Sequence, residues 1–297
     1  MPQTTMSQGP SKRVDTSGAR SDGGRATKSH SEFTGSIPEV YDTCLGPLLF
    51  EFPAADLATR VSGVVDGGRV LEIACGTGIL TEHLRRALPA EVEILATDLN
   101  PGMLDFARAS RGDLPGVQYE VADALALPYP DDAFDAVVCQ FGIMFFPDLS
   151  EGLKEMLRVL RPGGFVACNV WDSLEVNSVA GVAHDTIARY FEADPPTFLK
   201  TPFGSCAMDP TVDAFRAIGF DRVVCEAVGD TVERPSAEEV ARGFVEGNPG
   251  VIEIRERAKA DPETIVAALA DELRLQFGAA PLRMPLRELV FVGHAPA

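Results

Sequence analysis

The chain has 297 residues, 45% hydrophobic and 24% charged, which is enough to bury a sizeable core as one elaborated domain or two small ones. Asp and Glu number 44 against 26 Lys and Arg, so the formal net charge is −18. Proteins that bind DNA or RNA gain much of their affinity from basic side chains on phosphates, so this balance argues against a nucleic-acid partner. The longest uncharged apolar stretch, residues 136–147, falls short of the roughly 20 residues that span a bilayer, and we expect no integral membrane association.

Residues 1–30 are predicted to form a disordered tail, because they are rich in Ser, Thr and Gly and contain few apolar residues. For the same reason they lack the apolar segment of a secretory signal. The six cysteines of the chain include no Cys-x-x-Cys pair and no spacing linked to histidine, so no metal site is predicted. Several of them fall in apolar runs, as buried thiols do, and this usage favours a cytoplasmic location.

From residue 69 the chain alternates between short apolar runs and amphipathic segments. The runs predicted as strands are residues 70–75, 93–99, 117–122, 134–141 and 165–171. Helices are predicted over residues 79–88, from 101 onward, and over 149–160. Repeated strand–helix units of this length predict a parallel sheet with helices on both faces.

The alternation becomes irregular after the fifth predicted strand. Helices are predicted over 176–191, 212–218, 236–246 and 261–277, and strands over 222–228 and 286–292. We expect an α/β, Rossmann-like seven-stranded sheet, mostly parallel with the last strand antiparallel, with helices on both faces and helical cap insertions. The expected domains are the tail (1–30), an N-terminal helical lid segment (31–62) and a main domain (63–297) with caps at about 173–210 and 234–280.

Polar residues at three predicted strand ends converge on a glycine turn. The turn, residues 76–78, follows the first strand and opens a helix, so a ligand can approach the backbone at the carboxyl edge of the sheet. Asp98 lies at the end of the second strand, where a carboxylate can accept both hydroxyls of a ribose. Asp123 follows the third strand, where it can accept from an adenine amino group, and Gln140 ends the fourth. A strand-terminal Asp also caps helices, but three polar ends at one turn favour a ligand site.

The motifs in this region resemble those of class I S-adenosylmethionine-dependent methyltransferases. They are VLEIACGTG (70–78), ATDLNPGML (96–104), the run from 121 to 148, and RVLRPGGFVACNVWD (158–172). The branch most resembled is the ubiquinone/menaquinone-biosynthesis type, which methylates small molecules. The resemblance implies S-adenosyl-L-methionine as cofactor and a small-molecule methyl acceptor. By position it assigns cofactor binding to Glu72, Ala74, Gly76, Gly78, Asp98, Asn100, Met103, Asp123, Ala124 and Gln140.

Within that set, the resemblance implies a separate role for each group of residues. Those in the glycine turn surround the methionine moiety, Asp98 holds the ribose and Gln140 lies near the sulfonium. The residues after Asp98 flank the adenosine, and those after the third strand read the adenine edge. Many relatives have glycine where this chain has Ala74, and alanine is tolerated if its φ is negative, as we expect here. Residues 161–164 are expected to form the turn into the fifth strand.

The methyl acceptor is expected to bind in an apolar pocket under the caps. Methyl transfer from a sulfonium depends mainly on in-line alignment, and a base is needed only if the acceptor keeps its proton at neutral pH. His184 and Tyr41 are the candidate bases, although a position on the helix surface is the simpler interpretation of His184. His294 should lie far from the cofactor edge. The predicted pocket residues are Tyr41, Leu45, Leu48, Leu49, Phe50, Phe52, Phe141, Met144, Phe145, Phe146, Phe191, Phe198, Phe203 and Phe244.

Two other functions remain open at this point. An NAD-dependent oxidoreductase shares the glycine turn and the acidic residue after the second strand, but the third glycine of the longer fingerprint is missing before Glu82. A non-catalytic module that binds S-adenosylmethionine is compatible with an intact cofactor site. The sequence identifies neither the acceptor, nor the carbon, oxygen or nitrogen that is methylated, nor the oligomeric state.

Overall fold

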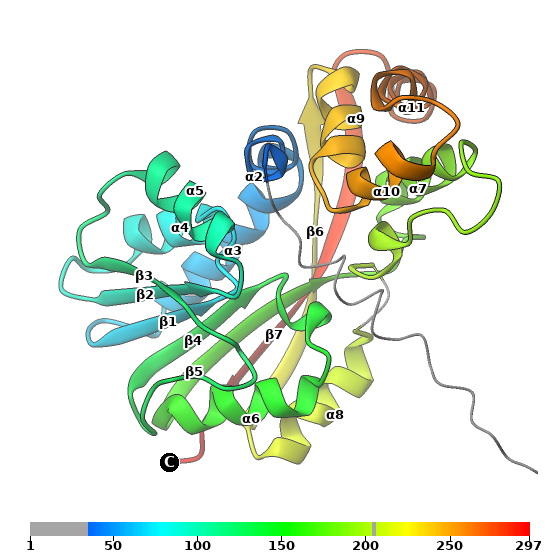
Figure 1. Ribbon diagram of the computed structural model, residues 1–297. Helices are drawn as coiled ribbons and strands as arrows, with labels where there is room; N and C mark the ends of the chain where they lie inside the picture. The colour runs from blue at the N-terminus through cyan, green and yellow to red at the C-terminus, as the bar shows by residue number, and fades with distance from the viewer. Residues whose placement is uncertain (1–34, 204–205) are drawn as a thin grey trace, which may run out of the picture.

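The computed structural model describes residues 35–203 and 206–297, so the tail predicted for residues 1–30 lies outside the described residues (Figure 1). A seven-stranded sheet with the order β3-β2-β1-β4-β5-β7-β6 forms the centre. Only β7 runs antiparallel to its neighbours β5 and β6, so the predicted sheet is confirmed. The strands are β1 (Arg69–Ile73), β2 (Glu93–Asp98), β3 (Val117–Val121), β4 (Phe134–Gln140), β5 (Leu160–Trp171), β6 (Asp221–Arg234) and β7 (Leu282–His294).

Helices cover both faces of the sheet. The helices before and after β1 and the helix after β2 lie on one face, and the two helices α6 and α8 lie on the other (Figure 1). On the first face are α3 (Glu51–Ser62), α4 (Ile79–Ala87) and α5 (Pro101–Arg111); on the second are α6 (Leu149–Val159) and α8 (Met208–Ile218). Strand β4 shows why two layers are needed, because its residues 136–139 are 0% exposed and so bury both faces of the strand.

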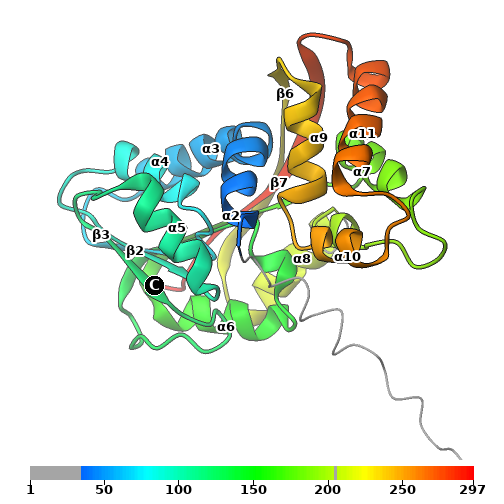
Figure 2. The same cartoon turned by 45° about the horizontal axis from the view of Figure 1, so that its top comes forward.

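The strands β6 and β7 continue past the end of β5 as a two-stranded ribbon. Trp171, at the end of β5, pairs with Glu288, and the part of β7 before Glu288 pairs only with β6. Four helices gather at this end of the sheet (Figures 1 and 2). They are α7 (Ser178–Ala188), α9 (Ala237–Glu246), α10 (Gly250–Arg257) and α11 (Pro262–Phe277). The segments predicted as caps thus gather at one end of the sheet, and α10 is an additional helix that the sequence did not indicate.

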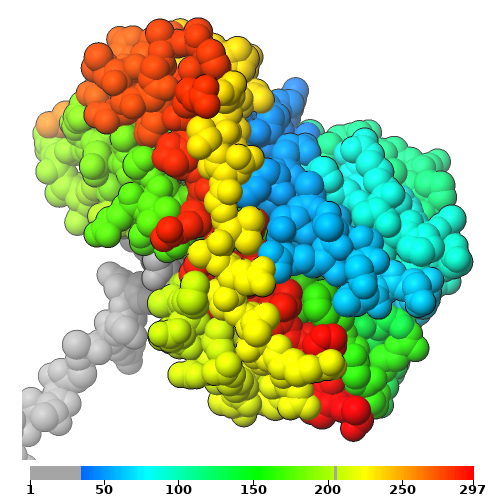
Figure 3. Space-filling model, turned by 180° about the vertical axis from the view of Figure 1, so that it is seen from behind, coloured from blue at the N-terminus to red at the C-terminus, as the bar shows by residue number. Residues whose placement is uncertain are grey.

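Several element boundaries differ from the prediction for physical reasons. Strand β6 is twice as long as expected because it is an edge strand whose outward side chains are polar, so its apolar pattern fades after Val228. Figure 3 shows β6 exposed along the back of the molecule. Residues 161–164, expected as a turn, belong to β5, where Leu160 already pairs with Phe134. The register of this pair shifts before Phe165, and Gly163 adopts a φ of +75° there.

The N-terminal segment is helical, as expected, but much of it is a π-helix. Helix α2 (Ile37–Val40) leads into the π-helix η1 (Tyr41–Phe50), which continues into α3. Helix α9 packs very closely on η1, since a Cβ on Gly243 would stand 2.7 Å from Leu45. This packing places η1 between the sheet and the helices of the ribbon (Figure 2). No helix in the described ranges is long and apolar enough to cross a bilayer.

Candidate functional site

The turn between β1 and α4 is built on three left-handed residues. Gly76 and Gly78 have φ values of +55° and +83°, and Ala74 has a φ of +55°. The expected negative φ at Ala74 is therefore wrong, and the left-handed region costs an alanine about 1–2 kcal/mol. The methyl group of Ala74 fits because the facing residue is Gly142, where an added Cβ would stand 2.7 Å from it.

Asp98, at the end of β2, holds the glycine turn and the next helix together. Its Oδ2 accepts from the N–H of Gly76 at 2.9 Å, and its Oδ1 accepts from the N–H of Asn100 at 2.8 Å. Asn100 caps α5 by accepting from the N–H of Gly102 at 2.9 Å. Met103, in the first turn of α5, is buried, and its Cε lies 4.0 Å from the place of a Cβ on Gly76. The structure thus brings Gly76, Asp98, Asn100 and Met103 together.

Two side chains at this edge, the buried Glu72 and the partly buried Gln140, each have a buried oxygen without a partner among the described residues. Glu72 on β1 is 1% exposed; its Oε2 accepts from the Thr81 hydroxyl at 2.7 Å, while its Oε1 has no partner among the described residues. Gln140, at the end of the neighbouring β4, donates from Nε2 to the Phe50 carbonyl at 3.2 Å, and its Oε1 is also without a partner in the described ranges. Burial, with a smaller contribution from Asp98, raises the pKa of Glu72 to about 8. Two buried acceptors suit a ligand that brings hydrogen-bond donors or a positive charge.

Asp123 and Ala124 follow β3 at the same edge of the sheet. The backbone of Ala122 donates to the Asp98 carbonyl at 3.2 Å, which keeps this loop beside the end of β2. Ala124 is buried, but the Asp123 side chain is exposed and its Oδ1 accepts from the N–H of Leu125 at 2.9 Å. Asp123 therefore forms a local turn, and its role toward a ligand stays a prediction.

The π-helix η1 is fastened over this edge by an ion pair. Asp42 pairs with Arg111 of α5, and both side chains are largely buried. Arg111 also donates to the carbonyl of Thr77 within the glycine turn at 3.1 Å. Tyr41, next to Asp42, is partly buried, and burial of its hydroxyl together with the carboxylates of Asp98 and Asp42 raises the pKa of that hydroxyl far above the usual value. Such a hydroxyl stays protonated at neutral pH, which argues against Tyr41 as a base.

Neither His184 nor His294 lies where it would act as a base at this edge. His184 on α7 is 7% exposed, so the interpretation as a helix-surface residue is wrong. Burial, with the nearby charge of Lys200, lowers the pKa of His184, which is therefore neutral near pH 7. A neutral histidine could accept a proton, but His184 does not line the apolar cavity that lies beside η1. His294 ends β7 opposite Phe165, far from the glycine turn, as predicted.

An apolar cavity lies beside η1, beyond the ends of β4 and β5. Ten of the residues predicted for the acceptor pocket line it: Tyr41, Leu45, Leu49, Phe50, Phe141, Met144, Phe145, Phe198, Phe203 and Phe244. Leu48, Phe52, Phe146 and Phe191 were also predicted but do not line it. Sequence reasoning missed Trp171, Leu199, Pro202 and Asn248. Trp171 could have been predicted as a lining residue, because it ends the predicted fifth strand at the same edge of the sheet.

The cavity walls contain stacked aromatic rings. Phe141 and Trp171 are nearly parallel, at 11°, with ring centroids 4.2 Å apart, and Phe203 also stacks on Trp171, with ring centroids 5.6 Å apart. Tyr41 and Phe50 form a second stack at 4.7 Å. The amide of Asn248 is held by the backbone, since its Nδ2 donates to the Phe244 carbonyl at 2.6 Å. These flat apolar surfaces suit a planar ligand with few polar groups.

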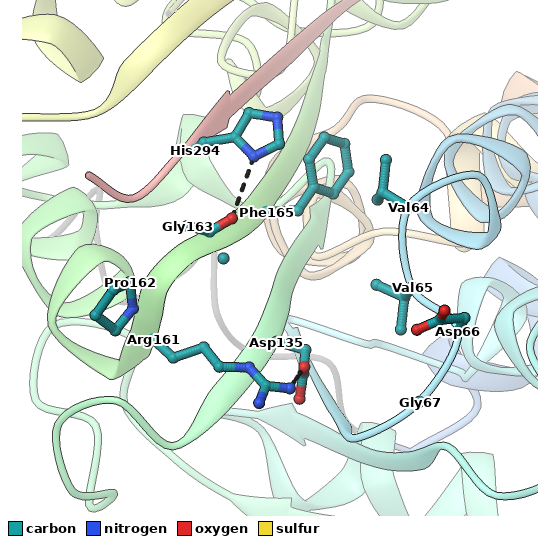
Figure 4. A pocket seen from close by; sticks show the side chains of 11 residues that line it. Val64, Val65, Asp66, Gly67, Asp135, Arg161, Pro162, Gly163, Phe165 and His294 are labelled. Atoms are coloured by element: carbon teal, nitrogen blue, oxygen red, sulfur yellow. Dashed lines mark hydrogen bonds and ion pairs between the residues drawn. The ribbon is translucent and has the colours of Figure 1, made fainter. Parts of the chain in front are cut away.

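A second cavity lies at the opposite edge, where the parallel strands begin (Figure 4). Its volume is about 170 Å³, and polar side chains from the starts of β4 and β5 line it. These groups are paired with one another or with the backbone: Arg161 with Asp135, and His294 Nδ1 with the Gly163 carbonyl at 3.4 Å. Parallel α/β sheets bind ligands at the carboxyl ends of their strands, so we place the functional site at the glycine turn and not here.

The sequence of this region matches that of known methyltransferases. A family model described as "Methyltransferase domain" matches residues 71–168. The demethylmenaquinone methyltransferase of Deinococcus radiodurans is 50% identical over 97 residues, which cover 32% of this chain and 40% of that protein. The chain therefore spans about two fifths of the length of this relative. The resemblance inferred from the motifs is confirmed for the segment that carries them, since residues 71–168 match the methyltransferase-domain model.

Solved structures share the fold of nearly the whole chain. The [4+2]-cyclase SpnF has a TM-score of 0.57 at 19% identity, over 92% of this chain and 97% of that chain. The phosphoethanolamine N-methyltransferase 2 of Haemonchus contortus, solved with phosphomonomethylethanolamine and S-adenosylhomocysteine, has a TM-score of 0.52 at 16% identity, over 89% of this chain and 61% of that one. At these identities the likeness concerns the fold alone, and it confirms the predicted Rossmann-like architecture.

Replacing Gly142 with alanine should destabilise the turn that accommodates Ala74. The added Cβ would stand 2.5 Å from Cys139 Sγ and 2.7 Å from the Ala74 Cβ, so the free energy of unfolding should fall by about 1–3 kcal/mol. Urea denaturation measures this change. The control is Gly181→Ala in α7, where the new Cβ meets nothing nearer than 3.8 Å and stability should rise by about 0.5–1 kcal/mol. Equal stabilities for the two variants would contradict the tight contact.

Proposed function

We propose that this chain transfers a methyl group from S-adenosyl-L-methionine to a small, largely apolar or aromatic molecule. The observation that carries the proposal is that Tyr41 borders both the edge with the glycine turn and the aromatic cavity. Tyr41 lies close enough to Asp98 for the carboxylate to affect its pKa, and it also lines the aromatic cavity. A nucleoside held at the glycine turn and a planar molecule in the cavity would therefore meet at this point.

The residues at the glycine turn fit this cofactor. Asp98 is placed to accept from ribose hydroxyls, and Asn100 and Met103 to flank the adenosine. The unpartnered oxygens of Glu72 and Gln140 suit the ammonium group of the methionine part. Gly76, Gly78, Ala74, Asp123 and Ala124 complete the proposed binding set. When bound, the cofactor supplies an activated methyl group on a sulfonium. The methyltransferase domain over residues 71–168 supports this assignment.

The chain contributes alignment and exclusion of water rather than proton transfer. The Tyr41 hydroxyl, which is not ionised at neutral pH, and the amide of Asn248, held by the backbone, are polar side chains of the cavity wall. No lining residue among those described is a general base near pH 7. The acceptor should therefore be nucleophilic as bound or ionise by its own acidity, and holding it in line with the methyl group supplies much of the rate.

A quinone-like or other planar ring is the acceptor class that the cavity favours. The parallel rings of Phe141 and Trp171 offer a flat apolar surface. The relative from Deinococcus radiodurans is named for methylation of demethylmenaquinone, but it aligns over only 97 residues, and the match to the family model ends at residue 168, before the cap segments. We also propose a cytoplasmic location, supported by the six cysteines, all of which carry free thiols.

Replacing Asp98 with asparagine tests the cofactor proposal. The variant loses the negative charge that accepts from Gly76, Asn100 and, in the proposal, the ribose. Hydrogen bonds to charged groups contribute about 1.5–3 kcal/mol, so the Kd for S-adenosylmethionine should rise about ten- to hundredfold. Isothermal titration calorimetry measures it.

The matched control is Asp113→Asn, an exposed residue in the loop after α5, which should leave the Kd unchanged. Unchanged affinity in Asp98→Asn, or no binding of the cofactor to the wild-type chain, would contradict the assignment. The same calorimetry with NADH addresses the oxidoreductase alternative, which tighter binding of NADH would favour. Cofactor binding without methyl transfer to any aromatic acceptor would favour a non-catalytic module.

Cofactor binding should release a proton from Glu72. In the free chain its pKa is about 8, so the carboxyl is neutral at about pH 6.5, whereas a positively charged ligand beside it favours the carboxylate. Affinity should therefore increase with pH up to about pH 8. Calorimetry in two buffers of different ionisation enthalpy counts the protons, and release should approach one per ligand. Glu72→Gln should abolish the release; an equal count in both proteins would show that another group titrates.

A further inference from the structure

A buried carboxyl group lies on β7, opposite Trp171 of the aromatic cavity. Glu288 on β7 is 0% exposed, and its Oε2 accepts from Asn169 Nδ2 on β5. Its Oε1 has no partner in the described part of the chain. The charged side chains nearest to it are Asp56 and Arg60 of α3, and Arg60 is engaged by Asp56 at 2.6 Å and by Glu226 of β6 at 2.8 Å. Glu288 therefore has no ion-pair partner of its own.

Asn169 connects this carboxyl to the backbone at the end of β4. Its side chain is 0% exposed, and its Oδ1 accepts from the N–H of Phe141 at 2.9 Å. Phe141 has a φ of +51°, a strained conformation for a bulky residue, which persists only where its surroundings hold it. The carboxamide of Asn169 is such a restraint, and Glu288 fixes which way that carboxamide points.

The restrained residue forms the wall of the cavity. The Phe141 ring stacks on Trp171 at 4.2 Å, and both rings line the cavity. Trp171 is also the Cα partner of Glu288 across β5 and β7. Glu288 is thus connected to both stacked rings. It pairs with Trp171 across β5 and β7, and the Asn169 side chain connects it to the backbone of Phe141.

We propose that Glu288 is a positioning residue, which holds the Phe141–Trp171 stack in place through Asn169 and so shapes the surface that receives a planar ligand. The proposal rests on the proposed function only in taking this cavity as the acceptor site. Glu288 lines no part of the cavity and touches no ligand there. Its effect on a ligand is transmitted through the two rings.

The arrangement depends on the protonation of Glu288. Burial raises the pKa of Glu288 to about 8; the hydrogen bond from Asn169 and the charge of Arg60 oppose this shift, and Asp56 adds to it. The neighbouring residues Arg287 and Asp172 pair with each other at 2.7 Å and do not neutralise it. Below about pH 8 the carboxyl is neutral and its burial is tolerated. As the pH rises through that value, the carboxylate that forms accepts more strongly from Asn169 but carries the cost of a buried charge, so the environment of the stack should change.

Trp171 supplies a direct measurement, because it is the one tryptophan in the chain. Its emission and its quenching by acrylamide report on the stack without any cofactor. In Glu288→Leu, which removes the acceptor for Asn169, the emission should shift to longer wavelength and quenching should increase. Glu288→Gln keeps an oxygen for Asn169 and should retain the wild-type emission at pH 7. Wild-type emission should show a transition near pH 8, which Glu288→Gln should lack.

Binding of 2-naphthol, a neutral planar probe that quenches tryptophan, measures the consequence for the cavity. Its Kd should rise about two- to tenfold in Glu288→Leu, the effect of one lost hydrogen bond, and stay unchanged in Glu288→Gln. A Leu variant with wild-type emission and affinity would overturn the proposal, as would a Gln variant that behaves like Leu. If the Leu variant does not fold, the pH titrations of wild type and Gln decide: identical transitions overturn the proposal.

These measurements separate the two proposals. A failure of S-adenosylmethionine binding leaves the emission and 2-naphthol results intact and overturns the proposed function alone. Normal cofactor binding and methyl transfer with no effect of Glu288→Leu on Trp171 overturn the positioning role alone.

Discussion

The carboxylate of Asp98 is the interaction on which the candidate site depends. It accepts from the backbone of Gly76, in the turn after β1, and of Asn100, at the start of α5, so one side chain fixes two loops relative to each other. Arg111, further along α5, then connects the turn to the N-terminal π-helix through Thr77 and Asp42. Asp98 and Arg111 thus fix the glycine turn, helix α5 and the N-terminal π-helix relative to one another. Because Asp98 already has backbone partners, its geometry is set before any ligand arrives, which reduces the cost of binding.

The fold by itself does not identify the reaction. The chain shares its architecture with a protein named as a [4+2]-cyclase as well as with a phosphoethanolamine N-methyltransferase, so chemistry has to be argued from the site. Two features of the site point toward methyl transfer: buried oxygens on β1 and β4 suited to a cationic ligand, and an aromatic cavity that adjoins them. Since Tyr41 borders both, the position of the N-terminal segment decides whether the two are connected.

The parts of the site that follow from local sequence could be predicted. Those that depend on contacts between segments far apart in the chain could not. Gly76 and Asp98 could be placed from the sequence because strand ends of a parallel sheet share one edge. The φ of Ala74 could not, since it depends on the missing side chain of Gly142 in a different strand–loop unit. The burial of His184 depends on the cap packing, which no periodicity reports. Glu288 and Asn169 are 119 residues apart, and only the insertion of β7 beside β5 brings them together.

The position of β7 has a consequence for the synthesis of the protein. This strand lies between β5 and β6, although it is the last of the seven to be made. While a ribosome has not yet released residues 282–294, β6 has no neighbour in the sheet and β5 has an open edge. The cover over the aromatic cavity is then also incomplete, because α9 and α11 flank the ribbon that β7 completes (Figure 1). The nascent chain must therefore tolerate exposed strand edges until β7 has emerged, which is a hazard for aggregation that its surplus of negative charge helps to counter.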